Sequence, residues 1–221
     1  MARTTGAGSG AGTRERLLRA AEELFAAHGV DGAQTRDIVR LAGQSNPSAV
    51  QYHFGSRAGL LDAVMAGRLA RTEAVLAPAL AAVEAQAGAA GPDLPALVGV
   101  LVTAEASLLR DNRGRRCLRV SAQLAHESGV RSRTPHPTLD GTATWRLIGL
   151  AEEALAAAGL PEALRLERIE LALTLIGTAL ADRARQYLDG ARPLTYEEAF
   201  LADLVGTTSA FLLAPAPAPY P

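Results

Sequence analysis

Apolar residues recur at helical spacing along most of the chain, and the first stripe lies near the N-terminus. Over residues 13–28 the stripe consists of Leu17, Leu18, Ala21, Leu24 and Phe25. Residues three and four positions apart share one face of a helix, so this stripe predicts an amphipathic helix. Thr13 is placed to cap its N-terminus and Gly29 to end it.

Two short helical segments follow. The first covers residues 35–42, with Thr35 as its expected N-cap. Its inward residues are Ile38, Leu41 and Ala42. The second starts with Asn46 as a cap and Pro47 at the first helical position, where the missing N–H costs nothing. Gly55 is expected to close it.

From residue 56 onward the helical segments become longer. Ser56 is the expected N-cap of a helix that extends to about residue 86, and Pro78 predicts a kink or a break inside it. Further helices are predicted at about 95–111, 113–127, 140–158, 161–189 and 195–213, with a loop at 131–140. We expect a flexible arm over residues 1–12, rich in Gly and Ala, and a disordered Pro-rich tail over 214–221.

The chain is therefore predicted to be all-α. Its 221 residues are 48 % hydrophobic but only 4 % aromatic, so the core must consist mainly of Ala, Leu and Val. Ala and Leu are also strong helix formers. The length suits one small and one medium domain, and we assign residues 13–57 to the first and 58–213 to the second.

Charge adds little to this picture. The net charge is −1, with +2 in residues 1–60 and −3 in the remainder. All 22 basic residues are arginines. Any contact with a phosphate group must therefore come from Arg, from polar side chains or from backbone N–H groups.

Cysteine content and hydropathy indicate a cytoplasmic protein. Cys117 is the single cysteine, so an intramolecular disulfide is excluded, and this suits a reducing compartment. The N-terminal residues contain no apolar leader. The most apolar stretch, residues 171–181, is shorter than the roughly 20 residues that span a bilayer, so no membrane association is expected.

The N-terminal pattern is typical of a helix-turn-helix, two short helices joined by a turn that contains Gly, after a longer helix. With Val50 toward the core and about 100° per residue, Phe54 points inward while Ser48 and Tyr52 point outward. Gln51 and Ala49 flank the outward direction on either side. Ser, Gln and Ala are residues that contact base edges in the major groove of DNA.

These segments resemble the N-terminal domain of the TetR family of transcriptional regulators. The resemblance rests on RERLLRAAEELFAAHG (residues 14–29), TRDIVRLAG (35–43) and SAVQYHFGSR (48–57), and it covers residues 14–65. Between Gly43 and Tyr52 the chain is one residue longer than the common pattern. Gln44, Ser45 and Asn46 thus form an enlarged turn, and which of them reaches DNA stays open.

The resemblance implies a dimer that binds a palindromic double-stranded DNA operator. It places Thr35 and Arg57 at phosphates, and Tyr52 and His53 near the DNA backbone. The complete set of candidate DNA contacts is Thr35, Arg36, Gln44, Ser45, Asn46, Ser48, Ala49, Gln51, Tyr52, His53 and Arg57. Other interpretations stay open: Thr35 as an N-cap only, His53 as a packed residue, and Gln51 and Tyr52 as a solvated face.

The resemblance also implies that the C-terminal domain binds an unknown small-molecule effector and forms a homodimer through helices 161–189 and 195–213. Candidate pocket residues are the polar or aromatic ones within apolar helices: Thr103, Ser107, Ser121, Thr142, Thr144 and Trp145. Trp145 is alternatively an ordinary core residue. Candidate residues for the dimer face are Leu164, Ile169, Ala172, Leu173, Ile176, Gly177, Leu180 and Ala181, which alternatively face the subunit's own core.

Two further expectations concern the whole chain. The Arg-rich residues 112–116 are placed to pair with Glu22 and Glu23 of the first helix, which would join the two domains. The sequence contains no catalytic, metal-binding or cofactor-binding motif of the common types, so we expect neither an enzyme nor a cofactor. The resemblance implies a repressor that a small-molecule effector releases from its operator. The alternative is an all-α enzyme or small-molecule-binding protein in which the N-terminal helices are only structural.

Overall fold

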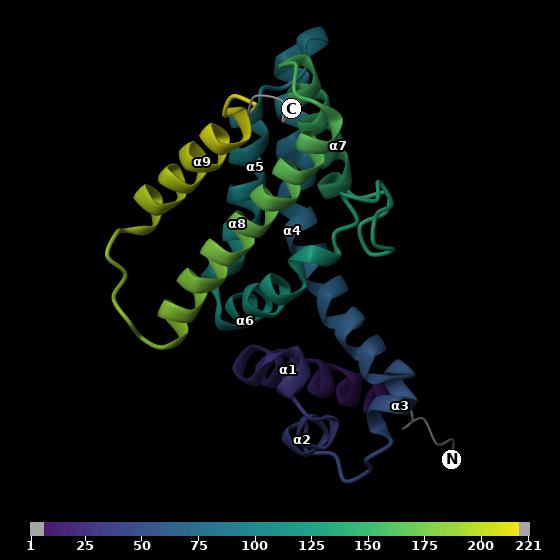
Figure 1. The fold of residues 1–221 in the computed structure, drawn as a ribbon. Helices are drawn as coiled ribbons and strands as arrows, with labels where there is room; N and C mark the ends of the chain where they lie inside the picture. Colours follow the sequence, from purple (N-terminus) through teal and green to yellow (C-terminus); the bar gives the residue numbers. More distant parts are fainter. Residues whose placement is uncertain (1–6, 217–221) are drawn as a thin grey trace, which may run out of the picture.

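Residues 7–216 are described by the structure, a computed structural model, and they form helices with no strand among them. The predicted all-α class is therefore confirmed. The α-helices are α1 (Ala7–Gly32), α2 (Thr35–Leu41), α3 (Ala49–Phe54), α4 (Arg57–Ala87), α5 (Leu94–Ala106), α6 (Asn112–Ser121), α7 (Ala143–Ala157), α8 (Glu162–Leu188) and α9 (Glu197–Leu213). Helices α1–α3 form a small lobe, and α4 leads from it into a larger helical body (Figure 1).

Three helix-ending or helix-starting residues, Gly29, Gly55 and Ser56, act where the sequence predicts. Gly29 leaves the helical conformation inside α1 with φ of 81°, and Gly55 ends α3 with φ of 74°. Both values lie in the left-handed region that glycine adopts without steric cost. The Ser56 hydroxyl accepts a hydrogen bond from the backbone N–H of Gly59 at 2.9 Å and so caps α4.

Several predicted helix ends and interruptions differ from the structure. Helix α1 begins at Ala7 rather than at Thr13, because extending an existing helix costs far less than nucleating one. Thr35 is not an N-cap, because the Gln34 carbonyl already accepts the first helical hydrogen bonds. Helix α4 continues through Pro78 without the break that was one of the two predicted outcomes, and the buried Leu76 and Leu80 pack on either side.

The predictions for the chain ends concern residues that are only partly described. Residues 1–6 of the predicted arm and 217–221 of the predicted tail lie outside the described part of the chain. Within it, residues 7–12 of the predicted arm are helical.

The N-terminal lobe has its own core. Leu17 and Phe25 of α1, Ile38 of α2 and Val50 of α3 are fully or almost fully buried in one cluster. This cluster also contains Leu60 and Val64 of α4, so the boundary predicted between residues 57 and 58 is displaced into α4.

One predicted core residue of α2 was wrong. Leu41 is 49 % exposed, whereas Val39, which was not predicted inward, is buried. Helix α2 has only seven residues. Its packing direction is therefore decided by its neighbours rather than by a stripe along its own sequence.

The larger body buries the inner faces of α5, α7, α8 and α9 in a second cluster. On α8, Ile169, Ala172, Ile176 and Leu180 belong to this cluster. The interpretation that these residues face the subunit's own core is confirmed for these four. A different face of α8 leaves apolar side chains exposed.

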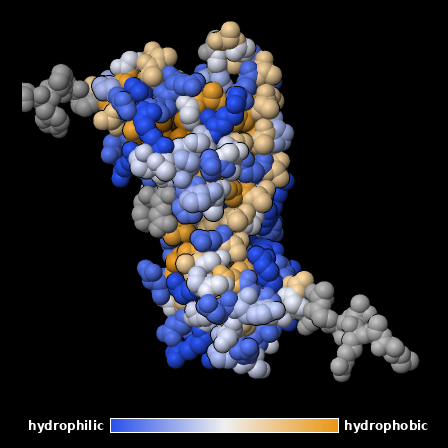
Figure 2. Space-filling view, turned by 90° about the vertical axis from the view of Figure 1, so that its right-hand side faces the viewer, coloured by the Kyte–Doolittle hydropathy of each residue, from blue (hydrophilic) through white to orange (hydrophobic). Residues whose placement is uncertain are grey.

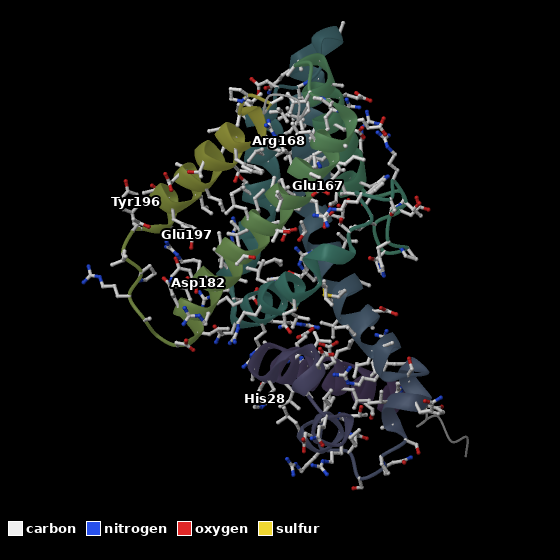
Figure 3. All side chains as sticks on the ribbon, in the orientation of Figure 1. His28, Glu167, Arg168, Asp182, Tyr196 and Glu197 are labelled. Atoms are coloured by element: carbon white, nitrogen blue, oxygen red, sulfur yellow. The ribbon has the colours of Figure 1, made fainter. Side chains whose placement is uncertain are left out.

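Two buried arginines fasten α9 to α8. Arg168 donates hydrogen bonds to the carbonyls of Leu212 at 2.8 Å and Pro215 at 3.0 Å, where the upper ends of the two helices meet (Figure 3). At the other end, Arg183 donates to the Thr195 carbonyl at 3.0 Å, and its guanidinium lies 4.0 Å from the ring centroid of Phe200. The pair of helices is thus held at both ends.

A buried ion pair joins the two lobes. The carboxylate of Glu22 on α1 is 5 % exposed, and Arg113 of α6 donates three hydrogen bonds to it at 2.7–2.9 Å. Arg113 also donates to Glu15 at 2.9 Å, and Arg116 lies 3.3 Å from Glu23. The predicted pairing between residues 112–116 and Glu22 and Glu23 is confirmed. Hydrogen bonding to Glu22 raises the pKa of Arg113 above its ordinary value.

Cys117 lies on α6 beside this ion pair and is buried. Burial raises the pKa of its thiol to about 11, so the thiol stays protonated and unreactive near neutral pH. No helix among the described residues combines the length and the apolar character that a bilayer span requires.

Replacing Arg113 tests how much the ion pair contributes to stability. Arg113→Ala is expected to lower the free energy of unfolding by about 2 kcal/mol, because it leaves the Glu22 carboxylate buried without its partner. The expected loss is below that of a fully buried pair because Arg113 itself is 40 % exposed. Urea unfolding followed by circular dichroism measures it.

Arg185→Ala is the matched control. The pair of Arg185 with Asp182 is half exposed on both sides, so its loss is expected to leave unfolding unchanged. Equal losses in the two variants would contradict a specific contribution of the Arg113–Glu22 pair.

Candidate nucleic-acid interface and effector cavity

Helix α3 presents a polar face to solvent at the end of the molecule away from the larger body. Ser48, Gln51 and Tyr52 are exposed, and Tyr52 is 83 % exposed. Val50 is buried and Phe54 is half-buried, packed against the same core. The predicted inward and outward directions of these five residues are confirmed.

Ala49 was predicted on this outward face and is buried instead, at 6 % exposure. Helix α3 packs against α4 as well as against α2, so its buried arc is wider than a single stripe. Ala49 belongs to the same buried cluster as Leu60 of α4. We therefore remove Ala49 from the set of DNA contacts.

The enlarged turn between α2 and α3 is held by its own side chains. The Gln44 amide donates to the carbonyls of Ala42 and Gly43, both at 3.3 Å. The Asn46 side-chain oxygen accepts from the backbone N–H of Ser48 at 2.9 Å. Asn46 was predicted to cap the helix with Pro47 at its first position, and this was wrong, because α3 begins at Ala49 with Ser48 at its N-cap and the Asn46 bond lies within the preceding turn. Ser45 is exposed at the tip. The turn thus presents Ser45 outward, while Gln44 and Asn46 form hydrogen bonds within the turn.

Three of the remaining candidate contacts lie at the start of α2 and on α3. Thr35 is half-buried at the first helical position, and Arg36 is exposed. His53 is half-buried, and its ring meets that of Tyr52 edge to face with centroids 4.9 Å apart. His53 is therefore in part the packed residue of the alternative interpretation.

Arg57 has an internal position that differs from the predicted phosphate contact. Its guanidinium donates hydrogen bonds to the carbonyls of Val30 and Ala33, the latter at 3.1 Å. It also lies 5.4 Å from the ring centroid of Phe25. Arg57 thus fastens the connection between α1 and α2 to the start of α4.

One basic residue near α3 was missed. The exposed Arg14 of α1 places its guanidinium 5.0 Å from the ring centroid of Phe54, beside the end of α3. Its sequence signal is its spacing, because position 14 lies four residues before Leu18 and so on the same helix face. Arg14 joins the candidate DNA contacts.

A cavity of about 190 Å³ lies in the larger body, between α4, α5, α6, α8 and the loop over residues 128–142. Apolar surface is visible at the waist between the two lobes on the side that carries this loop (Figure 2). Apolar residues from several helices line the cavity, among them Leu61, Met65, Leu101, Leu173 and Ile176.

Of the predicted pocket residues, Ser121 and Thr144 line this cavity. Thr103 is exposed on α5, and the Ser107 hydroxyl donates to the Ala104 carbonyl at 2.6 Å. Thr142 caps α7, and Trp145 packs at the edge of the apolar core, as its alternative interpretation stated. These four residues do not line this cavity, because the direction of a side chain depends on how its helix packs.

The charged residues of the cavity were missed by sequence reasoning. Arg68 of α4 and Glu105 of α5 form an ion pair with side chains only 14 % and 12 % exposed. Asp62 of α4 also lines the cavity and is exposed. His136, from the loop over residues 128–142, lines the cavity as well. The sequence does not show that Arg68 and Glu105 form an ion pair, because the two residues are 37 positions apart in the chain.

The cavity and the N-terminal lobe share one segment of chain. Ser121 and Leu124 line the cavity, whereas Val120 is fully buried in the core of the N-terminal lobe. The side-chain oxygen of Gln123 accepts from the backbone N–H of Val30 at 2.9 Å. Residues 120–124 therefore contact both the cavity and the connection that positions α2.

Comparison with known proteins finds the same architecture. Residues 17–64 match the family model described as bacterial regulatory proteins, tetR family. A solved bacterial regulatory protein in the tetR family from Rhodococcus RHA1 is similar with a TM-score of 0.51 and 23 % identity, covering 90 % of this chain and 96 % of that chain.

Two other solved structures are similar over comparable lengths. One is described as a TetR-family transcriptional regulator from Rhodococcus sp., with a TM-score of 0.49 and 17 % identity over 91 % of this chain and 99 % of that one. The other is a TetR variant from Acinetobacter baumannii in complex with minocycline, with a TM-score of 0.48 and 15 % identity over 95 % of each chain. No curated protein sequence matches the chain.

The position of Arg57 makes its replacement a test of folding. Arg57→Ala is expected to lower the free energy of unfolding by about 1.5 kcal/mol, because hydrogen bonds from a charged donor to two carbonyls are lost. Gln51→Ala, on the exposed face of the neighbouring helix, is expected to leave it unchanged. Thermal unfolding of both variants measures the difference, and an unchanged Arg57→Ala protein would contradict the structural position of Arg57.

Proposed function

We propose that the chain is a DNA-binding transcriptional regulator of the TetR family, whose model matches residues 17–64, and that it is a dimeric repressor released from its operator by a small-molecule effector. A transcription factor of this family is not an enzyme. The proposal therefore replaces the alternative in which the N-terminal helices are only structural.

The exposed face of α3 is the observation that supports base recognition best. A short helix with Ser48, Gln51 and Tyr52 outward and its core residues inward is free to enter the major groove. Gln51 pairs with adenine through two hydrogen bonds, and Ser48 donates to or accepts from either base type. Both are exposed, and α3 lies in the N-terminal lobe, away from α9 (Figure 1).

Phosphate contacts position this helix on the duplex. We assign them to Thr35 and Arg36 at the start of α2, to Arg14 beside α3, and to Tyr52 and His53. Contacts of this kind carry affinity and orientation but no sequence information. Arg57 leaves this group because its guanidinium is bonded inside the domain.

The dimer interface is assigned to the outward faces of α8 and α9. Leu171 and Leu175 are 49 % and 38 % exposed, one helical turn apart on α8. On α9 the small residues Ala202, Gly206 and Ala210 are exposed at four-residue spacing. Small residues let a partner helix approach closely, and a two-fold axis relates two reading helices to two half-sites.

The effector is proposed to act through the shared segment. A ligand in the cavity contacts the stretch that carries Ser121 and Leu124, which is joined to the N-terminal lobe by Val120 and Gln123. A ligand shifts such an equilibrium only if it binds one arrangement better than the other. Coupling of this type typically changes DNA affinity by about 5–150-fold.

Two single substitutions are expected to weaken DNA binding in different ways. Gln51→Ala removes a base contact and should cost about 1–3 kcal/mol at one position of each half-site, with the salt dependence unchanged. Arg36→Ala removes a phosphate contact and should weaken binding to all sequences, lowering the salt slope by about one unit. The measurement is a set of titrations against salt, on duplexes selected from a random pool.

Selected duplexes should contain inverted half-sites, and their absence would contradict the dimer. A Gln51→Ala protein with full sequence preference would show that Gln51 does not read bases. Ser45 at the tip of the turn would then be the next residue to replace.

Adding a charge to α8 tests the dimer interface. Leu175→Glu is expected to yield monomers by light scattering and to lower operator affinity by at least tenfold, because a charge buried between two apolar helices lacks a partner. Ala156→Glu adds the same charge to the exposed side of α7, which lies across the body from α9 (Figure 1), and should leave the dimer intact. A monomeric wild-type protein, or a dimeric Leu175→Glu variant, would exclude this interface.

A further inference from the structure

The volume of the cavity and the residues that line it restrict which small molecules can bind there. An engineered apolar cavity of about 150 Å³ accepts benzene. The present one measures about 190 Å³ and has apolar walls on α4, α5 and α8. It therefore has room for one ring with a short substituent.

Three of the four hydroxyl groups in the lining have already donated their hydrogens within the protein. Ser121 donates to the Leu118 carbonyl at 3.1 Å, Thr144 to the Glu73 carboxylate at 2.5 Å, and Ser128 to the Glu170 carboxylate at 2.7 Å. A hydroxyl group has one hydrogen and two lone pairs. What remains for a ligand at these positions is acceptor capacity.

The charges at the cavity also disfavour an anion. Among the described residues of the lining, Arg68 is the one arginine, and Glu105 already neutralises it in their ion pair. The carboxylate of Asp62 has no such partner among the residues of the lining. A negatively charged ligand would meet this carboxylate with no free cation to offset it.

His136 and Thr138 contact each other within the loop. Nδ1 of His136 lies 2.9 Å from the Thr138 hydroxyl oxygen and 3.4 Å from its backbone nitrogen. The buried Nε of Arg68 has no hydrogen-bond partner among the described residues, so it is a donor that the hydroxyl oxygen of a ligand can meet.

We infer that the cavity takes a compact molecule of one-ring size that carries an amine or hydroxyl donor and no negative charge. This inference rests on the proposed sensing function and names the class of its effector. The ring packs against Leu101, Leu173 and Ile176, and the donor faces the side of the lining that carries Ser121 and Asp62.

Three probes with the same ring separate the possibilities: benzylamine, benzyl alcohol and benzoate. Each is titrated into the full-length protein without DNA, and binding is followed by nuclear magnetic resonance. We expect benzylamine to bind tightest and benzoate at least tenfold more weakly than benzylamine. Benzoate binding as tightly as the other two, or no binding of any probe, would overturn the inference.

A cavity-filling variant tests the location. Gly177 lines the cavity, and a Cβ atom added there meets no atom within 4 Å, so Gly177→Leu places a side chain in the open space without a backbone clash. We expect it to weaken benzylamine binding at least tenfold. Gly149→Leu is the matched control, because Gly149 is equally unobstructed but exposed on α7 away from the cavity. Unchanged binding to the Gly177→Leu protein would overturn the location.

A charge-removing variant tests the carboxylate. Asp62→Asn should reduce the preference for benzylamine over benzyl alcohol, whereas Glu153→Gln, an exposed carboxylate of α7, should not. An unchanged preference in Asp62→Asn would overturn the assignment to Asp62. Because binding is measured without DNA, a failure here leaves operator binding standing. Conversely, a protein that ranks the probes as expected but binds no operator contradicts only the proposed function.

Discussion

The buried carboxylate of Glu22 is the constraint on which the arrangement of the two lobes depends. A carboxylate removed from water is strongly destabilising unless charged donors replace its hydration. Arg113 supplies three hydrogen bonds from the other lobe. The stability of α1 is therefore linked to the position of α6, and the lobes do not behave as independent bodies joined only by α4.

The residues around this ion pair extend the same link toward both sites. Arg116 pairs with Glu23 on one side, and Val120 enters the core of the N-terminal lobe on the other. Gln123 then holds the backbone of Val30, whose carbonyl is also bonded by Arg57. The connection between α1 and α2 is thus fastened from the larger body and from α4 at once. A displacement of residues 120–124 acts directly on the element that sets the position of α2 and α3.

Helices α8 and α9 have inner faces that belong to the subunit's own core and outer faces that are exposed. The inner face of α8 belongs to the subunit's own core, and Arg168 and Arg183 hold α9 against it. This leaves the outer faces of both helices as one preassembled surface with exposed leucines and small residues. The cavity lies on the inner side of α8, lined by Leu173 and Gly177, so the proposed effector and the proposed partner subunit contact different faces of the same helix.

The sequence by itself determined the helical class, the glycine stops at Gly29 and Gly55, the Ser56 cap and the directions of Val50, Gln51 and Tyr52. These features depend on local backbone chemistry and on the helical period, both of which are set by residues close together in the sequence. The predicted pairing of residues 112–116 with Glu22 and Glu23 was also confirmed, because complementary charges are visible in the sequence.

Tertiary structure alone decided that Ala49 is buried, that Leu41 is exposed and that Arg57 bonds inside its domain. It also decided that Arg68, Glu105 and Asp62, rather than Thr103 or Thr142, line the cavity. Each of these outcomes depends on the angle at which one helix packs on another, and that angle is set by contacts between residues far apart in the chain.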